Sequence, residues 1–311
     1  MNVAITGSAG FIGSHVADWF TNNGFGVVAI DSFTYAANPA NTIDFEPNAI
    51  AGYKIDINQQ QDISSICKNH DIQWIINLAA HTHVDRSIES CDDFLWSNVL
   101  GVKSLLEVCK EDSVKLLHVS TDEVYGDIAE GSFHEYARLN PKNPYAATKA
   151  SADMMIKAYE NTYGVECIIV RPSNNFGPRQ HTEKLFPKSV TRISEGKKVP
   201  LYGDGKQIRE WTSVYETASA IGFIIKNRDS LKNNIYNISS GIELQNIEMI
   251  KLICDVMNKE ADEHIEFVED RLGHDQRYSI SSQFLRAEGF EYEGDFHSDI
   301  EKTVKHYARS T

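Results

Sequence analysis

Tyr145 and Lys149 stand four residues apart in a stretch of helical pattern. Positions i and i+4 share one face of a helix, so we expect the lysine ammonium beside the phenol. A neighbouring positive charge favours phenolate and lowers the pKa of tyrosine from about 10. The pair is a candidate base that takes a proton from an alcohol whose carbon loses hydride. Taken alone, the spacing is more typical of an ordinary surface helix pair.

A second group of chemically capable residues follows the strand pattern Leu116–Ser120. Thr121, Asp122 and Glu123 come next in the chain. Side chains at the carboxyl end of a parallel strand face the ligand crevice of such a sheet. Two adjacent carboxyl groups there predict paired proton transfer, with one group protonated as acid and its neighbour acting as base. The alternative is a solvated acidic turn that caps the next helix.

A glycine loop, Gly7-Ser8-Ala9-Gly10-Phe11-Ile12-Gly13, joins the first strand pattern to the first helix pattern. Gly7 suits a tight turn, Gly10 lets backbone approach a pyrophosphate, and Gly13 lets helix and strand pack closely. The helix N-terminus then offers N–H groups to the pyrophosphate. Asp31, at the end of the second strand pattern, is placed to bind ribose hydroxyls, which favours NAD over NADP. The alternative is a glycine-rich turn that binds nothing.

These residues need a scaffold in which strands and helices alternate. Strand patterns are predicted at Asn2–Thr6, Gly26–Ile30, Tyr53–Ile57, Trp74–Leu78, Leu116–Ser120 and Val165–Arg171, and helix patterns at Gly13–Asn22, Gln61–Lys68, Asp93–Lys110, Tyr145–Tyr163, Tyr215–Asn227, Gln245–Met257 and His297–Tyr307. The alternation predicts an α/β fold, a Rossmann-type doubly wound parallel sheet with a smaller C-terminal α/β domain. We expect residues 1–172 plus about 212–238 to form the NAD-binding domain. Residues 173–211 plus 239–311 would form the second domain, with a ligand crevice between the two.

Composition narrows the class of protein. The 311 residues carry 30 Lys and Arg against 44 Asp and Glu, a net charge of −14. This charge disfavours nucleic acid and anionic membranes as partners, although a local basic pocket can coexist with it. Five scattered cysteines without a C-x-x-C pair predict neither disulfides nor a metal site and fit a reducing, cytoplasmic location. We find neither a secretory signal nor an apolar stretch long enough to span a membrane.

With these motifs in view, the chain resembles the extended short-chain dehydrogenases/reductases, and more closely the nucleotide-sugar 4,6-dehydratases. The resemblance runs nearly end to end. The most discriminating piece is Ser120-Thr121-Asp122-Glu123-Val124-Tyr125-Gly126, since related epimerases and decarboxylases usually lack the Asp-Glu pair. Further matches lie at Thr34–Asn38, Leu78–Ser87, Asn143–Asp153, Ser173–Pro178, Gln207–Trp211 and Asp270–Asp275.

The resemblance implies conversion of an NDP-glucose (dTDP- or UDP-glucose) to its 4-keto-6-deoxy derivative with tightly held NAD. Tyr145 would take the C4 hydroxyl proton while hydride leaves C4. Lys149 would hold the phenolate and a cofactor ribose hydroxyl, and Thr121 would bind the C4 oxygen. Glu123 would then remove the C5 proton and Asp122 would protonate the departing C6 hydroxyl, before hydride returns to C6.

The resemblance also assigns binding residues and an assembly. Besides the glycine loop, Tyr145 and Lys149, the implied NAD-binding residues are Phe11, Ile12, Asp31, Thr34, Asp56, Ile57, Ala79, Ala80, Ser97 and Asn175. The implied substrate-binding residues are Thr82, Asn174, Lys184, Leu185, Pro200, Tyr202, Arg209, Asn237, Arg271 and His274. A homodimer paired through the helices at 93–110 and 145–163 is implied as well. Met154, Met155, Ala158 and Tyr159 fit either that interface or the core.

Two positions depart from the family pattern. His81 replaces a common Glu and is expected next to the sugar, and Leu272 replaces a Pro in the nucleotide-binding loop. The runner-up interpretation is a related nucleotide-sugar epimerase, decarboxylase or 5,6-dehydratase. A catalytically silent NAD-sensing regulator is a third, but such a protein typically loses the Tyr or the Lys.

Overall fold

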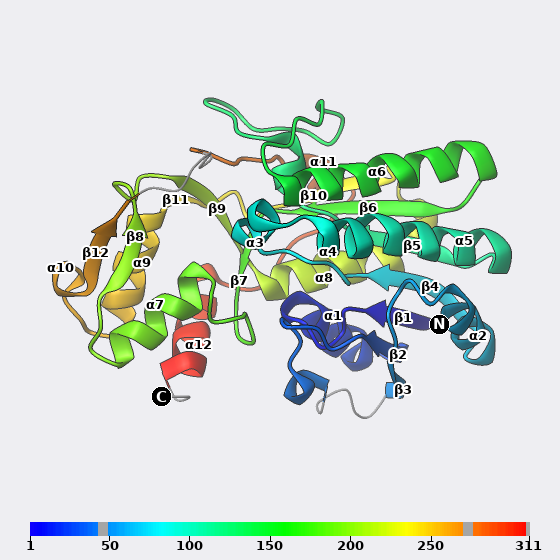
Figure 1. Cartoon of the computed structure of the whole chain (residues 1–311), viewed down its shortest axis with the longest axis horizontal. Coiled ribbons are helices and arrows are strands. Elements are labelled where there is room, and N and C mark those ends of the chain that lie inside the picture. Colours follow the sequence, from blue (N-terminus) through cyan, green and yellow to red (C-terminus); the bar gives the residue numbers. More distant parts are fainter. Residues whose placement is uncertain (43–48, 270–275, 309–311) are drawn as a thin grey trace.

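The computed structural model describes residues 1–42, 49–269 and 276–308. Its central element is a parallel sheet of seven strands within these residues, in the order β10-β6-β5-β4-β1-β2-β3 (Figure 1). The strands are β1 (Asn2–Thr6), β2 (Gly26–Asp31), β3 (Ala49–Lys54), β4 (Ile72–Asn77), β5 (Lys115–Val119), β6 (Cys167–Pro172) and β10 (Ile235–Ile238). The order reverses between β1 and β4, as in a doubly wound dinucleotide-binding fold. The predicted fold class is confirmed.

Helices cover both faces of this sheet because its strands are apolar on both sides. Val3 and Ile5 of β1 pack into one core with α1 and α8, whereas Ala4 packs into the other core with α2, α5 and α6. The helices that accompany the sheet are α1 (Phe11–Asn22), α2 (Gln60–Asn69), α3 (Val84–Glu89), α4 (Asp92–Phe94), α5 (Val102–Asp112), α6 (Pro144–Tyr163), α8 (Val214–Lys226) and α11 (Gln283–Ala287). Short 3-10 turns are η1 (Pro39–Thr42), η3 (Asp122–Tyr125) and η4 (Arg228–Ser230).

The remaining elements gather beside the carboxyl edge of the large sheet around a separate apolar core (Figure 1). They comprise β7 (Asn174–Phe176), α7 (Leu185–Ser194), β8 (Val199–Tyr202), β9 (Ile208–Ser213), β11 (Glu243–Gln245), α9 (Asn246–Val256), α10 (Ala261–His264), β12 (Ile265–Val268) and α12 (Phe296–Ala308). Strands β11, β9 and β7 form one small sheet, and β12 pairs with β8. Both α8 and β10 lie with the large sheet although they follow β9 in the chain.

Two predicted elements differ from the structure. The strand predicted at Tyr53–Ile57 runs instead over Ala49–Lys54, and Asp56 and Ile57 belong to the loop that follows it. The single helix predicted at Asp93–Lys110 is interrupted by a π-helical segment, η2 (Leu95–Gly101). At that segment the Asn98 side chain forms two hydrogen bonds with the backbone of His81, so the widened turn connects this helix to the segment that follows β4.

Within the described residues, no helix is both long enough and apolar enough to cross a membrane.

Candidate active site

The predicted tyrosine and threonine meet where β5 ends and α6 begins. Tyr145 is the second residue of α6 and is buried, and its phenol shares a hydrogen bond with the Thr121 side chain. Thr121 also donates to Asp122 Oδ1 at 3.2 Å and accepts from the Glu123 backbone N–H at 3.3 Å. Thr121 follows β5 and therefore lies at the carboxyl edge of the sheet. Its hydroxyl connects the Tyr145 phenol to both carboxyl-bearing residues, Asp122 and Glu123.

The two carboxyl groups have different surroundings. Asp122 is buried in η3, and one of its oxygens, Oδ2, has no hydrogen-bond partner. Burial and then the charges of Glu123 and Glu210 raise the pKa of Asp122 well above its ordinary value. Glu123 instead lines a large cavity. The pair therefore offers one carboxyl group held toward the neutral acid and one that is open to a ligand.

Lys149 is buried beside the end of β5. Its Nζ donates to the Val119 backbone oxygen at 2.7 Å and lies 3.2 Å from Nε2 of His118. Burial lowers the pKa of Lys149 to about 8, with the Asp153 carboxylate opposing that shift. A lysine in this setting changes charge near neutral pH.

The expected lowering of the tyrosine pKa is wrong for this structure. Burial raises the pKa of Tyr145 above its ordinary value, the Glu123 charge adds to the rise, and the bond with Thr121 opposes it. Tyr145 and Lys149 do lie on the same helix, α6, but the lysine side chain extends to the end of β5, where its Nζ donates to the Val119 carbonyl oxygen. The i, i+4 spacing does not specify that competing acceptor.

Asn143 is a site residue that the sequence reasoning missed. As N-cap of α6 it accepts from the Ala146 N–H with Oδ1 at 2.8 Å, and its Nδ2 donates to Glu123 Oε2 at 3.0 Å. The same side chain therefore begins the helix that carries Tyr145 and orients the Glu123 carboxylate. An Asn directly before Pro144 is a recognisable N-cap signal.

The glycine loop forms the cradle that a dinucleotide requires. Gly7 has φ of +67°, and a Cβ there would lie 2.7 Å from the Ala79 backbone N. A Cβ on Gly13 would lie 2.0 Å from the Gly7 carbonyl oxygen, so only glycine lets α1 approach β1 this closely. The Asp31 carboxylate accepts from the N–H groups of Ala9 (2.9 Å) and Phe33 (2.7 Å), which fixes it beside the loop.

A pocket opens between this loop and the ends of β2, β3 and β4. Its lining includes nine of the predicted cofactor residues, namely Gly7, Gly10, Asp31, Thr34, Asp56, Ile57, Ala79, Ala80 and Ser97. The predicted residues Phe11, Ile12 and Gly13 lie in the first turn of α1 and are not in the lining. Sequence reasoning missed Ser32, Ala36, Ala37 and Trp96 in this lining. Asn175 lies on β7, buried, with an unpartnered Oδ1. A cradle that excludes Cβ atoms and an orphaned buried acceptor both fit a bound dinucleotide.

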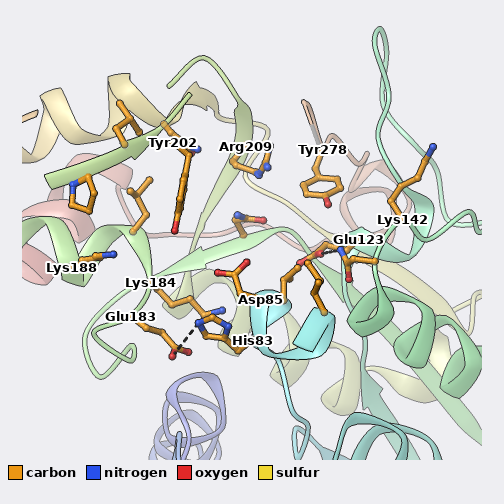
Figure 2. A pocket seen from close by; sticks show the side chains of 18 of the residues that line it. His83, Asp85, Glu123, Lys142, Glu183, Lys184, Lys188, Tyr202, Arg209 and Tyr278 are labelled. Carbon is orange, nitrogen blue, oxygen red and sulfur yellow. Dashed lines mark hydrogen bonds and ion pairs between the residues drawn. The ribbon is translucent and has the colours of Figure 1, made fainter. Parts of the chain in front are cut away.

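A second cavity, of about 420 Å³, lies between the large sheet and the smaller part of the chain. Figure 2 shows Tyr202, Arg209 and Tyr278 along one side, with Asp85 and Lys184 across from them. The lining includes the predicted substrate residues Asn174, Lys184, Leu185, Pro200, Tyr202 and Arg209. It also includes Lys142 and Lys188, which sequence reasoning missed. The cavity thus gathers four cationic side chains in a chain of net charge −14.

Not every predicted substrate residue reaches this cavity. Asn237 is wholly buried on β10, where it accepts from the Tyr125 hydroxyl at 2.9 Å and donates its N–H to Glu135 at 3.0 Å, so its assignment is corrected to the interior. Thr82 lies in the segment between the two pockets and is in the lining of neither. Arg271, Leu272 and His274 lie outside the described residues.

His81 also differs from its expected place. It lines the pocket beside the glycine loop and not the larger cavity. Its backbone exchanges two hydrogen bonds with Asn98, and its ring lies between those of Tyr35 and Phe94, at centroid distances of 5.9 and 5.6 Å. Burial lowers the pKa of His81, which favours the neutral form of the ring.

Comparison with known proteins decides the family. The family model described as GDP-mannose 4,6 dehydratase matches residues 4–303. The chain belongs to this family. Its members and their neighbours share the short-chain dehydrogenase/reductase fold, which confirms the resemblance drawn from the motifs.

Individual relatives align with this chain over almost its whole length. The low-salt glycan biosynthesis protein Agl12 of Haloferax volcanii is 40% identical, over 99% of this chain and 98% of its own. A dTDP-glucose 4,6-dehydratase of Streptomyces venezuelae, DesIV, solved with NAD bound, is 36% identical with a TM-score of 0.92, covering 99% and 97%. A UDP-glucose 4-epimerase of Thermus thermophilus, solved with NAD, is 26% identical with a TM-score of 0.90, covering 100% of both chains.

The double role of Asn143 is testable with two variants. Asn143→Ala removes the cap and the donor to Glu123, and is expected to lower the free energy of unfolding by about 1 kcal/mol. Asn143→Ser keeps a capping oxygen and is expected to regain most of that loss. Urea unfolding followed by circular dichroism measures both. Equal stability of the two variants would contradict the capping role.

Proposed function

We propose that this chain is an NAD-dependent NDP-glucose 4,6-dehydratase, with dTDP- or UDP-glucose as substrate and an NDP-4-keto-6-deoxyglucose as product. The observation that carries the proposal is the placement of Tyr145, Thr121, Asp122 and Glu123 within one hydrogen-bonded group beside a cavity of nucleotide-sugar size. Family membership and the dTDP-glucose 4,6-dehydratase relative support it.

The residues around the glycine loop would hold NAD. The N–H groups at the start of α1 suit the pyrophosphate, and Asp31 suits the adenosine ribose. When bound, NAD supplies the acceptor for hydride from C4 and the donor of hydride to C6. Because this exchange leaves the cofactor unchanged over a turnover, we expect it to stay on the protein.

Oxidation at C4 requires a base for the hydroxyl proton. Tyr145 takes that role, and Thr121 holds the oxygen with the hydroxyl that already binds the phenol. The burial that raises the pKa of Tyr145 has to be offset by positive charge, and Lys149 is the buried cation on the same face of α6. In its ammonium form, Lys149 provides that charge.

Elimination of water divides between the two carboxyl groups. Glu123 faces the cavity and accepts a hydrogen bond from Asn143, so it is the base for the C5 proton once C4 is a ketone. Burial raises the pKa of Asp122 well above its ordinary value, which favours the neutral acid that the departing C6 hydroxyl requires. An epimerase needs only Tyr145 to move a proton at C4, so it would leave this pair without a role.

The larger cavity suits the nucleoside diphosphate. Arg209 and Lys184 are the cations placed for phosphate oxygens, and Arg209 is held over the Tyr278 ring at 4.7 Å. Leu185, Pro200 and Tyr202 offer apolar surface to a base and its ribose. In this proposal residues 1–172 plus about 212–238 bind NAD, and residues 173–211 plus 239–311 bind the nucleotide sugar.

Product analysis tests the proposal. Purified protein, with and without added NAD, is incubated with dTDP-glucose, UDP-glucose, CDP-glucose, GDP-mannose and UDP-N-acetylglucosamine. Loss of one water by mass spectrometry and a C6 methyl signal by NMR are expected with dTDP- or UDP-glucose, also without added NAD. Water loss without a methyl would indicate a 5,6-dehydratase. A C4-inverted sugar of unchanged mass would overturn the dehydratase in favour of an epimerase.

The proposal includes a homodimer formed by η2, α5 and α6. Leu95 and Leu100 of η2 and Met154 of α6 are exposed large apolar residues, at 45%, 48% and 58%. Of the residues that the sequence left open between interface and core, Met154 and Ala158 are exposed, Met155 is partly buried and Tyr159 is buried. Pairing of two such faces would remove the exposed apolar surface from water.

The double variant Leu100→Glu, Met154→Glu is expected to convert a dimer to a monomer, because it replaces two exposed apolar side chains of the proposed interface with charged ones. Light scattering during size-exclusion chromatography measures the mass. Phe267→Glu is the matched control, since Phe267 is 58% exposed on β12, away from this face. A wild-type monomer, or a double variant that remains dimeric, would contradict the assigned interface.

A further inference from the structure

A row of buried polar side chains crosses the centre of the large sheet and ends at Lys149. Thr6 of β1 donates to Asn77 Oδ1 of β4 at 2.6 Å, and Asn77 Nδ2 lies 3.0 Å from Nδ1 of His118 on β5. His118 Nε2 lies 3.2 Å from Lys149 Nζ. Thr6, Asn77 and His118 are wholly buried and Lys149 is 1% exposed. Such groups are costly to bury in the middle of a sheet unless each has its partner.

The row can serve Lys149 in both of its protonation states. With the Asn77 amide donating to Nδ1, His118 carries its proton on Nε2 and donates to a lysine amine. A half-turn of that amide puts its oxygen toward Nδ1, and Nε2 then accepts from a lysine ammonium. Thr6 has a hydroxyl, which donates or accepts, so it satisfies the amide in either orientation.

We propose that His118 is a positioning residue for the reaction, which holds the Lys149 amino group through the Thr6–Asn77–His118 row and keeps it bonded as amine or ammonium. The inference rests on the proposed function for the role of Lys149, but the contacts themselves do not. With Val119 and His118 as fixed partners, Nζ keeps one further N–H for the cofactor side of the site.

The charged groups around His118 and Lys149 are consistent with a neutral His118 ring that positions the lysine. The charged groups that act on the pair are Asp153 of α6, on Lys149, and Arg171 of β6, on His118. Asp153 and Arg171 are paired with each other at 2.9 Å and buried. Burial and the neighbouring cations lower the pKa of His118 well below its ordinary value, so the ring stays neutral and is free to donate or accept at Nε2.

Two substitutions of similar size test the two nitrogen atoms of the His118 ring separately. The Gln side chain in His118→Gln reaches the position of Nε2, where its amide can donate or accept, whereas the shorter Asn side chain in His118→Asn reaches only Nδ1. We expect kcat to fall about 10- to 100-fold in His118→Asn with little change in KM, because a hydrogen bond to a charged group is lost. His118→Gln is expected to recover most of this loss. Equal kcat for the two folded variants would overturn the proposal.

The pH dependence of kcat gives a second measurement, because a loss of packing alone would not shift its alkaline limb. An ammonium has three donors to satisfy and suffers more than an amine when an acceptor is removed. The alkaline limb of kcat is therefore expected about one pH unit lower in His118→Asn than in His118→Gln. Coincident alkaline limbs would overturn the assigned contact.

A measurement on the wild-type holoenzyme keeps the test independent of the variants' folding and of turnover. The ¹⁵N signal of His118 Nε2, assigned by site-specific labelling, is expected to shift with the titration of Lys149 near pH 8, where an isolated buried neutral ring would not respond. An unmoved signal would overturn the coupling. A wild-type protein without dehydratase activity, by contrast, would count against the proposed function while leaving this titration to decide the contact.

Discussion

Parallel strands place all their carboxyl ends at one edge of the sheet, and the candidate site depends on that constraint. The glycine loop follows β1, the Leu78–His81 segment follows β4, and Thr121–Glu123 follow β5. These strands are neighbours in the sheet, so the loops meet without long connections. The close approach of α1 to β1 at Gly13 completes the arrangement, because any larger residue would displace the helix N-terminus.

Burial then sets the chemistry of the groups at this edge. The same loss of hydration raises the pKa of Asp122 and lowers that of Lys149, so a carboxyl group and an amine are both drawn toward neutral pH. The polar row behind Lys149 and the bond between Asn143 and Glu123 keep these groups in place. The lining of the larger cavity carries four Lys and Arg side chains against three Asp and Glu side chains, and this local excess of positive charge favours a negatively charged ligand within an acidic chain.

Much of this was predictable from sequence because its signals are local. The periodic patterns predicted the parallel sheet, and Asp31 ends β2 as expected. The glycine spacing predicted a cradle that only residues without a Cβ can form. The predictions that were wrong concern residues whose positions depend on contacts between segments distant in the sequence. Asn98, in the widened turn, is hydrogen-bonded to His81. Asn237 is held in the interior by hydrogen bonds with Tyr125 and Glu135. Nζ of Lys149 donates to the Val119 carbonyl oxygen of β5. Spacing along one helix does not contain that information.

The central claim is that oxidation by the Tyr145 group precedes an elimination for which Glu123 is the base. Single-turnover reaction of the Glu123→Gln holoenzyme with the preferred NDP-glucose tests this most directly, since glutamine keeps the size of the side chain and removes the base. The account predicts that the near-ultraviolet absorbance of reduced nicotinamide rises and persists, while no water is lost from the sugar. Formation of the dehydrated product at the wild-type rate would contradict it.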